Sequence, residues 1–89
     1  MSKTTANWGS NSVVARFSVF TKDRYYHIGI IYQIQGLFET AIDAYQKSVA
    51  TISSLADVHY RLGQSYYATY HYNAAVIAYQ AALEFANVA

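Results

Sequence analysis

The 89-residue sequence contains no cysteine and no proline. Without cysteine the chain forms no disulfide and no thiolate metal site, and it gives no indication of a redox compartment. Without proline, no residue removes a backbone donor from the inside of a helix. Charged residues are scarce too, at 12% of the chain against roughly 25% in an ordinary soluble domain. Two interpretations of this scarcity stay open: a tightly packed small domain coated with tyrosine, or a surface that a partner covers.

The charge and the hydropathy pattern exclude several classes of partner. A net charge of +1 provides no strong attraction to nucleic acid or to an acidic membrane surface. The sequence has no run of about 18 apolar residues, so we expect no membrane-spanning helix, although a partner within a membrane complex is compatible with it. A protein partner is therefore the favoured class, and the compartment is not indicated.

Residue types that carry chemistry are few and scattered. His27, His59 and His71 show no metal-ligand spacing, and no carboxylate stands beside any of them. The four glycines are dispersed along the chain instead of forming a phosphate-binding loop. We therefore expect no catalytic residue, no metal site and no cofactor, and we do not expect the chain to be an enzyme.

The sequence does contain a strong internal repeat. Gly29 and Gly63 lie 34 residues apart (63 − 29 = 34), and residues 22–55 align with residues 56–89 at that shift. Identical residues in the alignment are Asp23/Asp57, Tyr26/Tyr60, Gly29/Gly63, Tyr32/Tyr66, Ala41/Ala75, Ala44/Ala78, Tyr45/Tyr79 and Gln46/Gln80. The chain thus divides into a lead-in of residues 1–21, repeat 1 of residues 22–55 and repeat 2 of residues 56–89. Within the lead-in, residues 11–20 form either a helix that packs on repeat 1 or part of a disordered segment.

Each repeat is predicted to be a pair of helices. Apolar residues recur at helical spacing over residues 22–35, 38–53, 54–69 and 72–87. Gly29 and Ala41 let the two helices of repeat 1 approach closely, as Gly63 and Ala75 do in repeat 2. The rings of Tyr32, Tyr45, Tyr66 and Tyr79 are expected to fill the space beside these small residues. The sequence therefore predicts an all-α fold of two helical hairpins.

This pattern resembles the tetratricopeptide repeat, a helix–turn–helix unit of 34 residues. Its first-helix signature appears as Ile28-Gly29 followed by Tyr32, and again as Leu62-Gly63 followed by Tyr66. Its second-helix signature of alanine and an aromatic appears as Ala41 with Tyr45 and as Ala75 with Tyr79. The resemblance implies two tandem hairpins in a short right-handed solenoid that binds proteins. The polar helix that normally shields the last repeat of this family does not follow in this sequence. Another copy of the chain, a partner or the continuation of a longer protein is therefore expected to cover that face.

In this family the first helix of each unit lines a groove that holds a peptide or helix of the partner. The resemblance places these residues of the chain in that groove: Asp23, Tyr26, Ile30, Gln33, Ile34, Asp57, Tyr60, Gln64, Tyr67 and Ala68. Six of them are the groove residues predicted to bind the partner: Tyr26, Ile30, Gln33, Tyr60, Gln64 and Tyr67. No basic residue stands at the groove positions, although His27 and Arg61 lie at its edge, so the carboxylate clamp of some members is not expected. Tyrosines suit broad amphipathic contact, which favours an apolar or mixed segment as ligand. For Tyr26, Tyr60 and Tyr67 the alternative is packing between helices.

Residues 72–87 are apolar on nearly all sides, so this helix should be buried on more than one side. Its stripe Tyr72, Ala75, Val76, Tyr79, Ala82 and Leu83 is predicted to face the rest of the repeat. A second stripe of Ile77, Ala81, Phe85 and Val88 is predicted to face a following helix and to bind a partner. The chain is therefore expected to be a scaffold or adaptor for another protein. The alternative is a structural unit that associates with itself, as a homo-oligomer, through this last helix.

Overall fold

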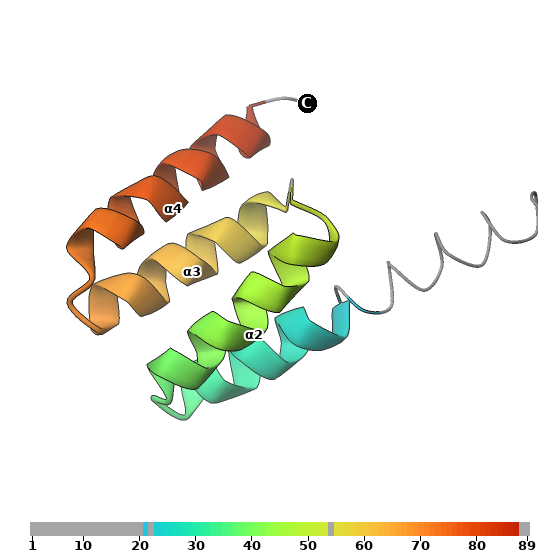
Figure 1. Ribbon diagram of the computed structural model, residues 1–89, viewed down its shortest axis with the longest axis vertical. Helices are drawn as coiled ribbons and strands as arrows, with labels where there is room; N and C mark the ends of the chain where they lie inside the picture. The colour runs from blue at the N-terminus through green and yellow to red at the C-terminus, as the bar shows by residue number, and fades with distance from the viewer. Residues whose placement is uncertain (1–20, 22, 54, 88–89) are drawn as a thin grey trace, which may run out of the picture.

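The computed structural model describes residue 21, residues 23–53 and residues 55–87. A first helix covers residues 23–34 and is followed by α2 (Phe38–Thr51), α3 (Ala56–Ala68) and α4 (Tyr72–Ala86). No strand occurs among the described residues. Figure 1 shows α3 lying between α2 and α4, and α3 packs against both. The prediction of an all-α fold with two helical hairpins is confirmed, and the helix boundaries differ from the predicted ones by at most two residues.

The two hairpin turns have the same backbone design. Gly36 has a φ of 81° and Tyr70, which is 34 residues later, has a φ of 67°. In each turn the next amide reaches back to a carbonyl of the helix, with Leu37 N donating to Tyr32 O and His71 N to Tyr66 O, both at 2.9 Å. This left-handed residue and its return hydrogen bond end a helix in a Schellman motif. Glycine adopts such a φ without strain, whereas a tyrosine does so at a cost.

Glycine also allows the two helices of each hairpin to approach closely. A Cβ atom built on Gly29 would lie 2.6 Å from Cδ1 of Tyr45, and one built on Gly63 would lie 2.7 Å from Cδ1 of Tyr79. Both distances are far shorter than a van der Waals contact, so each ring occupies the space that a side chain would need. The predicted fit of Tyr45 and Tyr79 against the two glycines is therefore confirmed.

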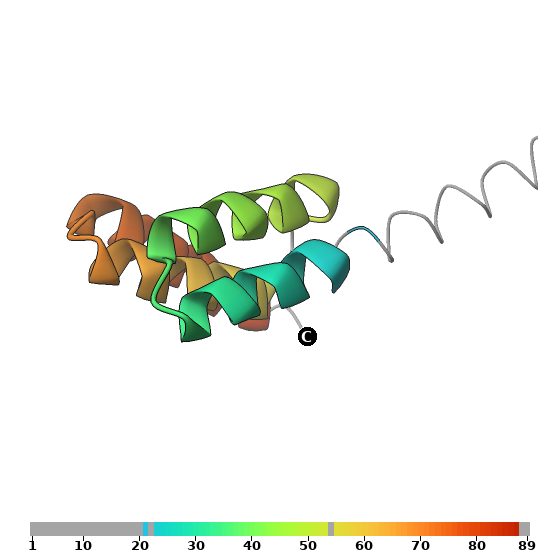
Figure 2. The same ribbon diagram turned by 90° about the horizontal axis from the view of Figure 1, so that it is seen from below.

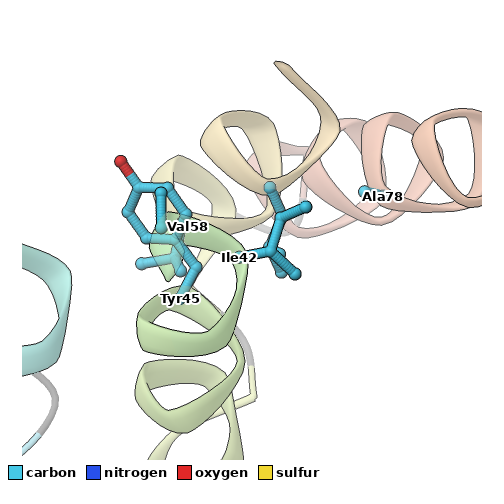
Figure 3. Close-up of a cluster of buried hydrophobic side chains, with 6 residues drawn as sticks. Ile42, Tyr45, Val58 and Ala78 are labelled. Atoms are coloured by element: carbon cyan, nitrogen blue, oxygen red, sulfur yellow. The ribbon is translucent and has the colours of Figure 1, made fainter. Parts of the chain in front are cut away.

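The buried core lies where repeat 1 meets repeat 2. Ile42 and Tyr45 of α2 form one cluster with Val58 and Leu62 of α3 and with Ala78 of α4. Figure 3 shows Ile42 and Tyr45 beside Val58 where α2 meets α3, with Ala78 on the neighbouring α4. The ring of Tyr45 has no exposed surface at all. Because the core depends on side chains from both repeats, neither repeat buries its apolar face alone.

Several predictions concern residues that the structure does not describe. The helix or disordered segment at residues 11–20 and the role of Val88 lie outside the described residues. They remain predictions.

Candidate functional site

The six predicted groove residues divide between the repeats, and together they are called the inner surface here: Tyr26, Ile30, Gln33, Tyr60, Gln64 and Tyr67. Those of repeat 1 are all half-buried, and Tyr26 and Ile30 pack against the core. In repeat 2, Tyr60 and Tyr67 are more than half exposed. The exposed part of the inner surface is therefore concentrated on α3.

A chain of polar hydrogen bonds crosses the inner surface from repeat 1 to repeat 2. The hydroxyl of Tyr45 donates to Oε1 of Gln33 at 2.6 Å, and Nε2 of Gln33 donates to Oε1 of Gln64 at 3.0 Å. These bonds satisfy the one polar atom of a ring that is otherwise wholly buried. The amides of Gln33 and Gln64 thus hold the repeats together, which leaves them less available to a ligand than the sequence predicted.

Arg61 takes a larger part in the inner surface than the sequence indicated. Its Nε donates to the hydroxyl of Tyr26 at 3.2 Å, and its guanidinium carbon lies 5.9 Å from the centroid of the same ring. The sequence placed Arg61 only at the edge of the groove. No spacing in the sequence indicates this contact, because it depends on how α3 packs against the first helix.

A second exposed surface lies at the end of repeat 2 and shares Tyr60 and Tyr67 with the inner surface. Its residues come from α3 and α4 and are called the end face here: Tyr60, Tyr67, Tyr72, Val76, Tyr79 and Leu83. Val76 is 53% exposed, whereas its counterpart Ile42 in repeat 1 is 7% exposed. Leu83 is 65% exposed, whereas its counterpart Val49 is half-buried against the core. The end face of repeat 2 is therefore the equivalent of the surface that α3 covers in repeat 1.

This result corrects the predicted orientation of α4. Val76, Tyr72 and Leu83 were predicted to face the rest of the repeat, but they are exposed. The stripe predicted to face a following helix instead includes Phe85, whose ring stacks on His59 of α3 with centroids 5.4 Å apart. Ala81 and Ile77 line a shallow groove beside Leu62 and Tyr66 of α3, although Ile77 remains 67% exposed. The predicted orientation was right for Ala75 and Ala82, which are buried, and wrong for Tyr72, Val76 and Leu83, because a helix that is apolar on all sides does not indicate which side is buried.

The end face contains an open groove of about 450 Å³ between α3 and α4. Its lining includes Asp57, Tyr60, Tyr79, Ala82, Leu83 and Ala86. The rings of Tyr60 and Tyr79 lie in contact, with centroids 5.6 Å apart, and those of Tyr67 and Tyr72 are 5.5 Å apart. The groove therefore offers apolar surface, phenol hydroxyls and, within this lining, one carboxylate.

Two tyrosines have shifted acidity. Burial raises the pKa of Tyr45 above its ordinary value of 10.0, and the nearby Arg61 opposes part of that shift. Burial also raises the pKa of Tyr79, and the neighbouring Tyr60 and Tyr67 add to the effect. Both groups therefore stay protonated at neutral pH, where their hydroxyls are hydrogen-bond donors.

Neither a metal-binding cluster nor a membrane-spanning helix occurs in the described part of the chain. Within it, no cluster of three or more histidines and carboxylates has the geometry to hold a metal ion. None of the described helices combines the length and apolar character needed to cross a bilayer.

Comparison with protein families gives one match. The model of the tetratricopeptide repeat matches residues 23–51 and again residues 56–88. These two segments coincide with the two helical hairpins of the structure. A search of curated proteins found no match to the chain.

Proposed function

Because the chain belongs to the tetratricopeptide repeat family, whose members generally mediate protein–protein interaction, we propose that it is a scaffold or adaptor that binds a peptide or helix of another protein. The exposure of Tyr60 and Tyr67 on the inner surface is the observation that supports this function. Tyrosine rings provide large contact areas and lose little side-chain entropy on binding, so they are frequent at binding hot spots.

The remaining inner-surface residues define the limits of this site. Tyr26 is held by Arg61 and packs against Tyr45, with the two ring centroids 6.3 Å apart. Truncation of Tyr26 would therefore weaken the fold as well as the binding of a partner. Ile30, Gln33 and Gln64 are half-buried, so they form the floor of the site and the two rings of α3 form its exposed contacts.

Capture of a partner from a native extract tests this function. The bait is the intact chain, and bound proteins are identified by mass spectrometry. Tyr60→Ala with Tyr67→Ala should abolish capture while the far-UV circular dichroism stays that of the parent chain. The conservative pair Tyr60→Phe with Tyr67→Phe keeps the rings and separates stacking from hydrogen bonding.

A matched control surface lies on α2 of repeat 1. Lys47 and Asp43 form an exposed ion pair at 3.3 Å, and an exposed pair of this kind contributes little to stability. Asp43→Ala with Lys47→Ala should therefore retain capture. Capture that survives loss of both α3 tyrosines would remove the inner surface from the proposal.

The competing function is a structural unit that associates with itself through α4. The exposure of Val76 and Leu83 on the end face is the observation that favours it. Light scattering across a range of concentrations separates the two functions. A mass that stays at one chain per particle at high concentration excludes self-association.

A further inference from the structure

The end face has an internal counterpart that shows how such a surface is covered. In repeat 1, Ile42 and Tyr45 are buried by α3, which contributes Val58 and Leu62 to the same cluster. In repeat 2 the equivalent Val76 and Tyr79 have no helix over them among the described residues, and Val76 is half exposed. In Figure 1, α3 covers one side of the first hairpin, and the corresponding side of α4 is the free end of the stack.

We infer that the end face is a docking site for one amphipathic helix of a protein partner, bound in the position that α3 occupies against repeat 1. The inference rests on the proposed function, protein binding, and adds the surface and the chemistry of the ligand. The bound helix carries aliphatic residues four positions apart, as Val58 and Leu62 are in α3. These side chains fill the groove formed by Tyr60, Tyr79 and Leu83.

The polar contacts of the bound helix follow from the same comparison. Arg61 of α3 donates to the hydroxyl of Tyr26, and the counterpart of Tyr26 on the end face is Tyr60. Asp57 lies beside Tyr60 in the lining of the groove. A guanidinium placed one residue before the second aliphatic position would donate to Tyr60, and Asp57 supplies a negative charge in the lining of the same groove.

A second copy of this chain is a poorer occupant than a foreign helix. Head-to-tail stacking of two copies would place the first helix of one copy on the end face of the other, in the position that α3 occupies against repeat 1. Arg24 would then take the place of Val58 (58 − 34 = 24), which is buried in the core. Burying a guanidinium at an aliphatic position is costly unless the charge is paired. The partner helix is therefore expected to carry an aliphatic residue there.

A peptide with the sequence of residues 55–68, with blocked ends, is a suitable probe because it contains the residues that cover repeat 1. The peptide should bind the intact chain, and peptide with Val58→Ser and Leu62→Ser should bind at least about tenfold more weakly. In the chain, Val76→Ser with Leu83→Ser should cause a similar loss. Ile31→Ser is the matched control, since Ile31 is an aliphatic residue of the first helix, is as exposed as Val76 (54% against 53%) and lies outside the end face. It should leave binding unchanged.

An isolated peptide of this length is only marginally helical, so a tethered form keeps the test decisive. The same segment is appended after Ala89 through a flexible linker, which gives an effective concentration on the order of millimolar. The fusion should unfold at a temperature about 4 °C or more above the parent chain. The serine version of the segment, or Val76→Ser with Leu83→Ser in the chain, should remove the gain.

Two results would overturn the inference. The first is a fusion that gains no stability over its serine version. The second is a dimer in light scattering that Val76→Ser with Leu83→Ser converts to a monomer, because a second copy would then be the occupant. Capture from native extract that persists alongside either result leaves the proposed function standing and removes only the end face as its site.

Discussion

Repeat 1 and repeat 2 have equivalent side chains in different surroundings. Tyr45 is wholly buried and donates to Gln33, whereas Tyr79 lies in an open groove against Tyr60. The difference arises because α3 covers the first hairpin and no described helix covers the second. In a repeat fold, stability comes from contacts between neighbours, so a residue in repeat 1 should matter more than its counterpart in repeat 2. Each of the predictions below tests that difference.

The largest expected effect is at the paired tyrosines. Tyr45→Ala removes a wholly buried ring and should cost about 3–5 kcal/mol, as other buried aromatic truncations do. Because small domains are stable by only about 5–15 kcal/mol, this loss should remove a large share of the chain's stability. Tyr79→Ala should cost roughly 1–2 kcal/mol, because part of the ring is already in water. Urea unfolding followed by circular dichroism measures both, and equal losses would contradict the comparison.

Substitutions of the paired glycines also test the difference between the enclosed repeat 1 and the open repeat 2. An added Cβ gains helix propensity worth about 1 kcal/mol over glycine, but overpacking a fixed core costs about 1–3 kcal/mol. At Gly29 the opposing ring of Tyr45 is enclosed, so Gly29→Ala should destabilise the chain by roughly 1–2 kcal/mol. At Gly63 the ring of Tyr79 has open space beside it, so Gly63→Ala should stay within about 1 kcal/mol of the parent. The midpoints of urea unfolding of the two variants measure this difference in stability.

In the hairpin turns, the substitution in repeat 2 is expected to stabilise the chain and the one in repeat 1 to destabilise it. Gly36 and Tyr70 share a left-handed backbone, which only glycine adopts without strain. Tyr70→Gly should therefore stabilise the chain by up to about 1 kcal/mol, and Gly36→Ala should destabilise it by about the same amount. A loss of stability in Tyr70→Gly would show that the contact between the rings of Tyr70 and Tyr72 outweighs the backbone strain.

The smallest expected effect is on alkaline stability. The pKa of Tyr45 is raised in the folded chain, so the folded state holds this proton more tightly than the unfolded state does. The contribution to stability is fully present below about pH 10 and is lost as the pH rises through the raised pKa. Tyr45→Phe should therefore make urea stability less dependent on pH between about 9 and 11. An unchanged slope would show that other tyrosines, such as Tyr79, carry the dependence.

The sequence alone was sufficient to predict the helices and the close packing of the two helices within each hairpin. Gly29 with Tyr45 and Gly63 with Tyr79 recur at a fixed shift, and a repeated small residue opposite a repeated ring indicates close helix packing. The buried side of α4 was predicted only in part, because Ala75 and Ala82 are buried as expected whereas Val76 and Leu83 are exposed. Val76 and Ile77 are adjacent and equally apolar, and only the position of α3 decides which of them faces the free end. The contact of Arg61 with Tyr26 also depends on the packing of one repeat against the other.

The one-sided packing of α4 has a consequence for local unfolding. A helix held by one neighbour opens at a lower free energy than a helix held by two, and α3 packs against both α2 and α4. Figure 2, which looks along the stack, shows the first helix and α2 in front of α3 and α4. Amide hydrogens of α4 should therefore exchange with solvent before those of α3. Among the helices that the structure describes, the one that carries Val76 and Leu83 should be the least protected. A ligand bound there would be detected first as slower exchange along this one helix.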